Sequence, residues 1–268
     1  MIQFTKTRYV DKFYYYDTDN IIGRSLAFYG EYAQPEIDFL LQFLNQKSVV
    51  YDIGGNIGYH ATAFASTGAR VFSFEPNPKN FNLLQHNTEK FDNVWLFNCA
   101  VGEEYGQVFC DDFDTDVPGN FGSVKVNQKH GIPVDQVALD TLTEATEIEL
   151  DFPPPDLIKI DVEGSEYNVL LGCENIITQH RPVIYYEAHE TLEFKEIYEF
   201  LESKGYRLYW AQVNNYNPKN LQNNFINIFP GTACFNVVAW PIDRPEILDL
   251  GAVAGANDDW RRFCSNKS

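Results

Sequence analysis

Apolar runs alternate with amphipathic segments along most of the chain. Short runs typical of buried strands occur at 48–53, 70–75, 93–98, 156–161, 182–187, 206–211 and 234–240. Segments with apolar residues at helical spacing lie between them, at 57–66, 78–90, 165–179 and 191–203. Strands that alternate with helices predict an α/β fold, with a mostly parallel seven-stranded sheet and helices on both faces.

Both ends of the chain and one internal stretch depart from this alternation. The N-terminal extension, residues 1–45, is aromatic and β-prone up to residue 32 and then has helical spacing over 35–45. Residues 102–138 hold short β-like pieces separated by glycine and proline, which predict a β-hairpin insertion. The tail, 241–268, predicts a short helix at best. Because no linker or repeat interrupts the core at 46–240, we expect the whole chain to form a single domain.

The composition narrows the classes of partner. The 268 residues are 44% hydrophobic and 15% aromatic, enough for a packed core and inconsistent with disorder. The formal net charge of -18 argues against nucleic-acid and anionic-membrane partners, because phosphates would be repelled. Neutral and cationic small molecules are still open, glycans included, and the oligomeric state is undetermined.

The sequence also suggests a compartment. The N-terminal residues lack the long apolar stretch of a secretory signal, and no apolar run has membrane-spanning length. The five cysteines are scattered and form no C-x-x-C pair, as free thiols do in a reducing cytoplasm. We therefore expect a cytoplasmic protein without a membrane span.

The run VVYDIGGNIGYH, residues 49–60, carries the first candidate chemistry. An apolar strand ends at the acidic Asp52 and enters a glycine-rich turn before a helix, which is the arrangement that binds nucleotides in open α/β sheets. A dinucleotide fingerprint requires glycines at relative positions one, three and six. Counted from Gly54, the third position is Asn56, the fifth Gly58 and the sixth Tyr59. The turn therefore fits NAD poorly.

Glu75, at the end of the next strand, suggests another ligand. A carboxylate there can accept hydrogen bonds from the two hydroxyls of a ribose, while the backbone of the glycine turn meets an amino-acid end. S-Adenosylmethionine has both parts and no pyrophosphate, and Asp52 can accept from its ammonium group directly or through a water. An ordinary βαβ unit with two capping acids is the alternative, but the paired acids favour the cofactor.

A second group of titratable residues follows two later strands. Asp161 and Glu163 end the strand in LIKIDVEG, and Glu187 and His189 end the strand in VIYYEAH. In a parallel sheet these ends meet at one edge, so we expect them to share a site with the glycine turn. Methyl transfer to an alcohol needs a general base, for which Asp161, Glu163 and His189 are candidates. His60 is a fourth, although a satisfied hydrogen-bond partner explains it more simply.

Other signals weaken the competing functions. There is no H-E-x-x-H and no Cys/His cluster, so no metal site is expected. The acidic run 111–116 lacks the glycine and the final glutamate of a calcium loop. No G-x-S-x-G elbow is present, which disfavours a hydrolase.

Several segments together closely resemble the FkbM family of S-adenosylmethionine-dependent methyltransferases. These segments are VVYDIGGNIGYH, VFSFEPNPKNFNLL, NVWLFNCAVG, DLIKIDVEGSEYNVLLG and RPVIYYE. The resemblance spans about residues 45–240, and IKIDVEG is its most specific piece. It implies a Rossmann-like class I methyltransferase fold and O-methylation of a hydroxyl, often on a sugar or polyketide. Some O-methyltransferases also use a divalent metal near the position of Asp161.

The resemblance assigns cofactor-binding roles by position. Residues that match the cofactor loop are Asp52, Gly54, Gly55, Asn56 and Gly58, with Gly55 standing where members often carry alanine. Glu75, with the adjacent Pro76, matches the ribose-binding acid. The residues that fall where the adenine pocket is usually lined are Asn98, Cys99 and Ala100.

We therefore expect an S-adenosylmethionine-dependent O-methyltransferase whose acceptor is a sugar, a glycan or a glycosylated metabolite. The catalytic residues expected from geometry are Asp161, Glu163, Glu187 and His189. Two alternatives are another Rossmann-like enzyme, such as an NAD-dependent oxidoreductase, and a non-catalytic glycan-binding module on the same fold.

Overall fold

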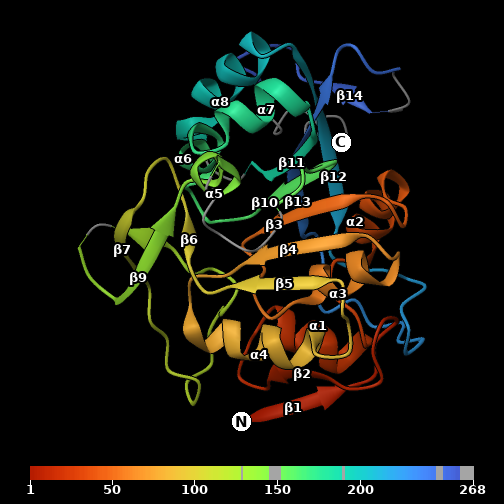
Figure 1. Cartoon of the computed structure of the whole chain (residues 1–268). Helices are drawn as coiled ribbons and strands as arrows, with labels where there is room; N and C mark the ends of the chain where they lie inside the picture. The colour runs from red at the N-terminus through yellow and green to blue at the C-terminus, as the bar shows by residue number, and fades with distance from the viewer. Residues whose placement is uncertain (128, 145–151, 189–190, 246–249, 260–268) are drawn as a thin grey trace.

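The computed structural model describes residues 1–127, 129–144, 152–188, 191–245 and 250–259 (Figure 1). Its main element is an eight-stranded sheet in the order β14-β12-β13-β11-β10-β3-β4-β5. The strands are β3 (Val49–Ile53), β4 (Arg70–Phe74), β5 (Val94–Phe97), β10 (Leu157–Ile160), β11 (Val183–Glu187), β12 (Tyr206–Asn214), β13 (Ala233–Pro241) and β14 (Gly251–Ala252). All seven strands predicted from the sequence are present in this sheet.

The sheet is mixed. Strands β11, β10, β3, β4 and β5 pair in parallel, whereas β13 lies antiparallel between β11 and β12. The short β14 adds an eighth strand, antiparallel to β12, from the tail in which the sequence suggested a short helix at best. That prediction was wrong for residues 251–252, because two residues that pair on a sheet edge leave no periodicity to read.

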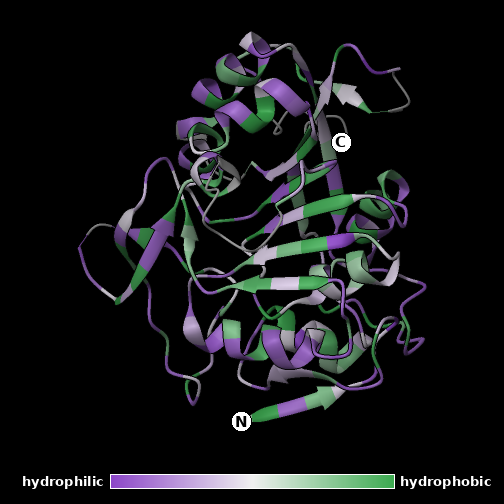
Figure 2. Ribbon diagram, viewed as in Figure 1, coloured by the Kyte–Doolittle hydropathy of each residue, from purple (hydrophilic) through white to green (hydrophobic). Residues whose placement is uncertain are grey.

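Apolar clusters fill both faces of the sheet, which explains the continuous apolar strands. One cluster joins the sheet to α2 (Gln34–Leu40), α3 (Tyr59–Ser66) and α4 (Pro78–Thr88). The other joins it to α6 (Glu166–Leu171), α7 (Glu174–His180) and α8 (Thr191–Ser203). Figure 2 shows mainly hydrophobic central strands and alternating character along the outer helices. Helices therefore cover both faces, as the alternating pattern predicted.

The helix predicted at 165–179 is broken in two. α6 ends at Leu171, and α7 starts at Glu174. A Cβ atom on the intervening Gly172 would lie 1.9 Å from the carbonyl oxygen of Gly102. The break lets the chain pass directly against the start of the insertion, a tertiary contact that apolar spacing cannot reveal.

The N-terminal extension is only partly β-structure. β1 (Ile2–Thr5) and β2 (Phe13–Tyr16) form an antiparallel hairpin, but Ile22–Tyr29 form a helix, α1, where the sequence suggested further β-structure. The Asp19 carboxylate accepts hydrogen bonds from the backbone N–H groups of Ile21 and Ile22, at 2.9 and 3.2 Å. These bonds order the turn that leads into α1 and were not predicted from the sequence. The helix predicted at 35–45 is α2 followed by one 3-10 turn, η1 (Leu41–Phe43).

The insertion forms a second, smaller sheet in the order β6-β9-β7-β8. β7 (Gly106–Cys110) and β9 (Ile132–Val137) pair antiparallel as the predicted hairpin, with β6 (Ala100–Val101) and β8 (Val126–Asn127) at the edges and α5 (Leu139–Glu144) after it. The long loop after β7 reaches α4, where the Asn80 side chain donates to the Phe121 carbonyl at 2.9 Å. Within the described part of the chain, no helix is both long and apolar enough to span a bilayer.

Candidate active site

A cavity of about 330 Å³ lies where the carboxyl ends of β3, β4, β10 and β11 meet. Its other walls come from the N-terminal extension, the insertion and the start of β13, represented by Ile22, Val124 and Cys234. The residues predicted from separate strand ends therefore converge on one hollow, as expected for the carboxyl edge of a parallel sheet.

The glycine turn closes the end of β3 against two neighbouring strands. The backbone N–H groups of Gly54 and Gly55 both donate to the Phe74 carbonyl oxygen at 2.9 Å. Gly54 has a φ of +80°, and a Cβ atom there would lie 1.8 Å from the Asp161 carbonyl oxygen. Only glycine fits this position, because any side chain would separate the turn from the end of β10.

Glu75 presents a buried carboxylate at the cavity wall. Its side chain accepts hydrogen bonds from the backbone N–H groups of Asn56, at 2.9 Å, and Asn77, at 2.8 Å. The residue is only 4% exposed, and this burial raises its pKa to about 7, although the two N–H groups oppose the shift. A fixed carboxylate that borders a cavity can accept further hydrogen bonds from a ligand's hydroxyls.

Asp52 lies beneath the turn and does not border the cavity. It is fully buried, accepts from the Ser73 hydroxyl at 2.9 Å, and has one oxygen 3.5 Å from the Lys159 ammonium nitrogen. Direct contact with a ligand's ammonium, one of the two routes suggested by the sequence, does not match this placement. Asp52 instead fixes Lys159, which borders the cavity.

Lys159 is the residue that sequence reasoning missed. Its ammonium group donates to the Gly54 carbonyl at 2.9 Å and lies 3.4 Å from the Asp161 carboxylate. Burial lowers its pKa, but the carboxylates of Asp161 and Asp52 outweigh burial, so the net pKa lies above the usual value. One charged residue inside an otherwise apolar strand was the available signal, since a buried lysine requires a charged partner.

The other predicted cofactor residues divide into two groups. Residues that border the cavity are Gly54, Gly55, Asn56, Glu75, Pro76, Cys99 and Ala100. Gly58 begins α3 with a φ of +91°. The Asn98 amide donates to the backbone carbonyls of Glu75 and Pro76, at 2.8 and 3.0 Å. Gly58 and Asn98, like Asp52, thus support the wall from behind.

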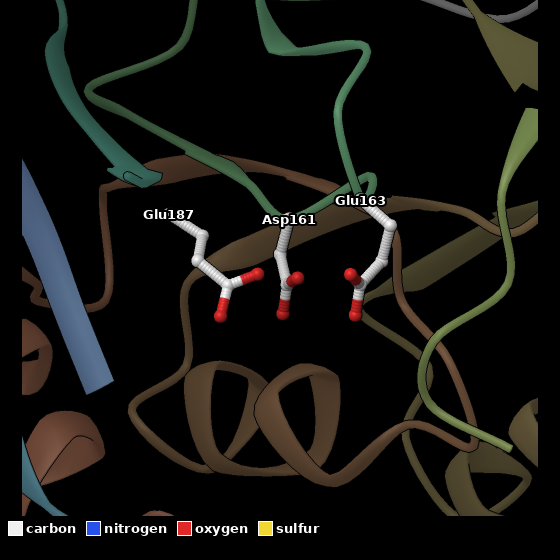
Figure 3. A group of neighbouring side chains, drawn as sticks. All are labelled: Asp161, Glu163 and Glu187. Atoms are coloured by element: carbon white, nitrogen blue, oxygen red, sulfur yellow. The ribbon is translucent and has the colours of Figure 1, made fainter. Parts of the chain in front are cut away.

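Asp161, Glu163 and Glu187 also line the cavity, and their side chains lie next to one another (Figure 3). One oxygen of each lies within 4.8 Å of the others. Burial raises the pKa of Asp161, but Lys159, His60 and a hydrogen bond with Glu187 outweigh burial, so the net pKa is lowered. This group, the acidic trio, could bind a shared cation or accept hydrogen bonds from a polyol. The absence of a bound metal, expected from the sequence, stays a prediction.

The two candidate histidines have different outcomes. His189 lies outside the described residues. His60 is at the start of α3 and borders the cavity, and its Nε2 lies 3.0 Å from a carboxylate oxygen of Glu36. Glu36 is therefore the hydrogen-bond partner expected if His60 has a structural role.

The cavity suits an adenosine group with a charged end. Glu75 can accept from ribose hydroxyls, and the backbone of the glycine turn is accessible beside it. Cys99, Ala100 and Val101 supply a largely apolar wall for a base. At the Cys99 wall, burial is the main cause that raises the thiol pKa, to about 12, so the sulfur is a neutral surface at physiological pH.

The sequence matches the family described as "Methyltransferase FkbM domain" over residues 52–208. Among curated proteins, it is similar to hexuronic acid methyltransferase AglP of Haloferax volcanii, 31% identical over 169 residues that cover 63% of this chain and 67% of the relative. It is also similar to 2-O-methyltransferase NoeI of Sinorhizobium fredii, 27% identical over 164 residues that cover 56% of this chain and 65% of the relative.

A crystal structure of an FkbM methyltransferase from Methylobacillus flagellatus is similar at a TM-score of 0.49 and 17% identity, covering 74% of this chain and 44% of that chain. At that score the likeness says nothing about substrate or site. The family match covers more than half of the present chain and includes the glycine turn, Glu75 and the acidic trio. The chain belongs to the FkbM family of methyltransferases.

Proposed function

We propose that this protein is an S-adenosylmethionine-dependent O-methyltransferase with a class I fold whose acceptor is a hydroxyl of a sugar or glycan. The observation that carries the proposal is the presence, in one cavity, of both the Glu75 carboxylate beside the glycine turn and the acidic trio. The family match and the curated relatives, both methyltransferases by description, support the reaction class.

The cofactor would occupy the half of the cavity between the glycine turn and Cys99. Glu75 would accept from the ribose hydroxyls, Cys99 and Ala100 would face the adenine, and the backbone of Gly54 to Asn56 would meet the amino-acid end. When bound, S-adenosylmethionine supplies a methyl group made electrophilic by its sulfonium. Lys159 and Asp52 hold the turn rigid from beneath, which supplies the positioning that displacement requires.

The acceptor would occupy the half bordered by the acidic trio. Carboxylates accept hydrogen bonds in pairs from the hydroxyls of a sugar, which a polyol offers in abundance. A second cavity of about 320 Å³ shares Glu163 and Glu187 with the first and has its own apolar wall at Phe194. Glu163 and Glu187 therefore lie where the two cavities meet, with room for an acceptor larger than one sugar ring.

Charge favours a neutral or cationic acceptor over an anionic one. Among the described residues that line the main cavity, the basic side chains are Lys159 and His60, and each is paired with a carboxylate. In the main cavity, a hexuronate, the acceptor class in the name of the Haloferax relative, would meet the acidic trio with no basic lining residue that is not already paired, whereas Lys125 lines the second cavity. We therefore propose that this chain methylates uncharged or amino sugars in preference to uronic acids.

Mass spectrometry tests the proposal. Purified protein is incubated with S-adenosylmethionine and matched methyl glycosides of glucose, rhamnose, N-acetylglucosamine, glucosamine and glucuronic acid, singly and as short oligosaccharides. The expected product is a neutral or amino sugar heavier by one methylene unit, with glucuronide transferred least. Transfer to glucuronide alone would overturn the acceptor class, and transfer to nitrogen or carbon instead of a hydroxyl would overturn the O-methylation.

A further inference from the structure

Glu36 and His60 form a buried pair at the edge of the acceptor half. Glu36 lies on α2 and His60 on the first turn of α3, and they are 7% and 8% exposed. One oxygen of Glu36 is 3.0 Å from Nε2 of His60, and the other accepts from the Asn236 amide at 3.1 Å. Because both oxygens are engaged, the carboxylate is held in one orientation.

This arrangement determines which ring nitrogen carries a proton. A carboxylate only accepts hydrogen bonds, so the contact with Glu36 favours a proton on Nε2 of His60 and leaves the lone pair on Nδ1. Among the described residues, none makes a hydrogen bond with Nδ1. His60 borders the main cavity alongside Asp161 and Glu187. The basic nitrogen is thus the one left for a ligand.

The neighbouring groups are less suited to accept a proton. Asp161 faces the Lys159 ammonium at 3.4 Å, and this contact stabilises the ionised carboxylate and weakens it as a base. The hydroxyl of Tyr185 accepts from the Asn236 amide at 2.6 Å. The other titratable groups around the pair are Tyr32, Lys159, Glu187 and Cys234. Among these groups His60 offers an imidazole lone pair, and the Glu36 carboxylate is placed to stabilise its protonated form.

We propose that His60 is the general base of the methyl transfer and that Glu36 is its positioning residue. The proposal rests on the O-methyltransferase function. As the acceptor oxygen forms its bond to the methyl carbon, the carbon–sulfur bond breaks and its electron pair stays on sulfur. The hydroxyl proton passes to Nδ1 of His60, and Glu36 balances the charge of the resulting imidazolium. This is the role that a carboxylate behind a histidine performs in other acid–base sites.

The ring tautomer gives a test that needs no acceptor. Protein labelled with ¹⁵N-histidine is examined by NMR at a pH where imidazole is neutral, and His60→Gln identifies the resonances. The expected spectrum shows the proton on Nε2 of His60, with loss of that preference in Glu36→Gln. A proton on Nδ1 in the wild type would overturn the proposal, because Nδ1 would then have no lone pair to accept the hydroxyl proton.

Kinetics test the catalytic role, with the sugar panel as acceptor and S-adenosylhomocysteine affinity as the control for folding. His60→Gln should lower kcat by about 10²- to 10⁴-fold with cofactor affinity unchanged, whereas the exposed His86→Gln should match the wild type. Added imidazole should restore part of the activity of His60→Ala, which a structural role would not allow. A His60→Gln enzyme within a few fold of wild-type kcat would overturn the proposal.

A wild type that transfers no methyl group to any sugar would overturn the acceptor class instead. The tautomer measured by NMR would then still test the contact between Glu36 and His60.

Discussion

The two halves of the main cavity are built in different ways. The cofactor half comes from a nearly continuous stretch, residues 54–101, and its Glu75 carboxylate is satisfied by two backbone N–H groups, while Asp52 behind it accepts from Ser73 and pairs with Lys159. The acceptor half is assembled from α3, the ends of β10 and β11, and the start of β13. It brings three carboxylates within 4.8 Å of one another.

The cofactor half is therefore preorganised by its own hydrogen bonds, whereas the carboxylates of the acceptor half are placed to interact with a ligand. A satisfied polar site is rigid and tolerates substitution poorly, because every removed partner leaves a buried group unpaired. A crowded set of like charges stores repulsion that a bound polyol or cation would relieve. We therefore expect substitutions to cost stability in the cofactor half and to cost function without stability in the acceptor half.

The largest effect is expected at Lys159. Lys159→Met removes the cation between Asp52 and Asp161, and an uncompensated buried carboxylate typically costs about 3–5 kcal/mol. The free energy of unfolding in urea measures this. Lys159→Met combined with Asp52→Asn should recover much of the loss, because the buried charge is then absent. If Lys159→Met alone were as stable as the wild type, the buried Asp52 carboxylate would not need its ion pair with Lys159 for the protein to stay folded.

Gly54 is expected to come next. Gly54→Ala and Gly164→Ala share the strain of a positive φ, about 1–2 kcal/mol, because φ is +80° at Gly54 and +95° at Gly164. Only the Gly54 methyl group overlaps another atom, the Asp161 carbonyl, whereas nothing lies within 4 Å at Gly164. Overpacking should therefore add about 1–3 kcal/mol at Gly54 alone. Equal unfolding free energies for the two variants would mean that the turn does not need its close contact with β10.

Glu75 tests the cofactor half by affinity. Glu75→Gln removes the charge from the acceptor of the ribose hydroxyls, and hydrogen bonds to a charged group contribute about 1.5–3 kcal/mol. Calorimetry should show S-adenosylhomocysteine binding weakened by about 10- to 100-fold. The exposed Glu103→Gln is the matched control and should bind as the wild type does. An unchanged affinity in Glu75→Gln would place the ribose elsewhere.

The raised pKa of Glu75 adds a pH dependence. Burial shifts the pKa upward to about 7, so the free protein holds a proton there under mildly acidic conditions. The ionised form is the better acceptor, and cofactor affinity should therefore rise with pH through neutrality, by about tenfold between about pH 6 and pH 8. Folding raises the pKa of Glu75, so its ionisation favours the unfolded chain. The folded protein therefore loses stability as pH rises from the pKa of Glu75 in the unfolded chain toward 7. A Glu75→Gln protein with the wild-type pH profile would assign the dependence to another group, such as His60.

The smallest effect is expected in the acidic trio. Two unit charges about 4–5 Å apart repel by about 1 kcal/mol at the dielectric constant of water. Glu163→Gln should therefore leave the thermal stability of the ligand-free protein unchanged or raise it by up to about 1 kcal/mol, while lowering acceptor affinity. Differential scanning calorimetry against Glu103→Gln measures the difference. A loss of more than about 1 kcal/mol would show that Glu163 supports the fold.

The same contrast explains what could be predicted from the sequence. The turn at Gly54 and the strand end at Glu75 are local patterns, because a glycine-rich turn between a strand and a helix dictates its own geometry. The strand ends at Asp161 and Glu187 were predictable because parallel strands share an edge. The Glu36–His60 contact joins two helices through side chains, and no spacing in the sequence reports it. The antiparallel position of β13 likewise depends on long-range pairing with β11 and β12.

The cofactor half is the central claim, and calorimetric titration of the wild-type protein with S-adenosylhomocysteine tests it most directly, with NAD as the comparison ligand. The account predicts one binding site per chain for S-adenosylhomocysteine, lost or greatly weakened in Glu75→Gln, and no heat with NAD. Binding of NAD in place of S-adenosylhomocysteine, or no binding of S-adenosylhomocysteine by the folded protein, would contradict it.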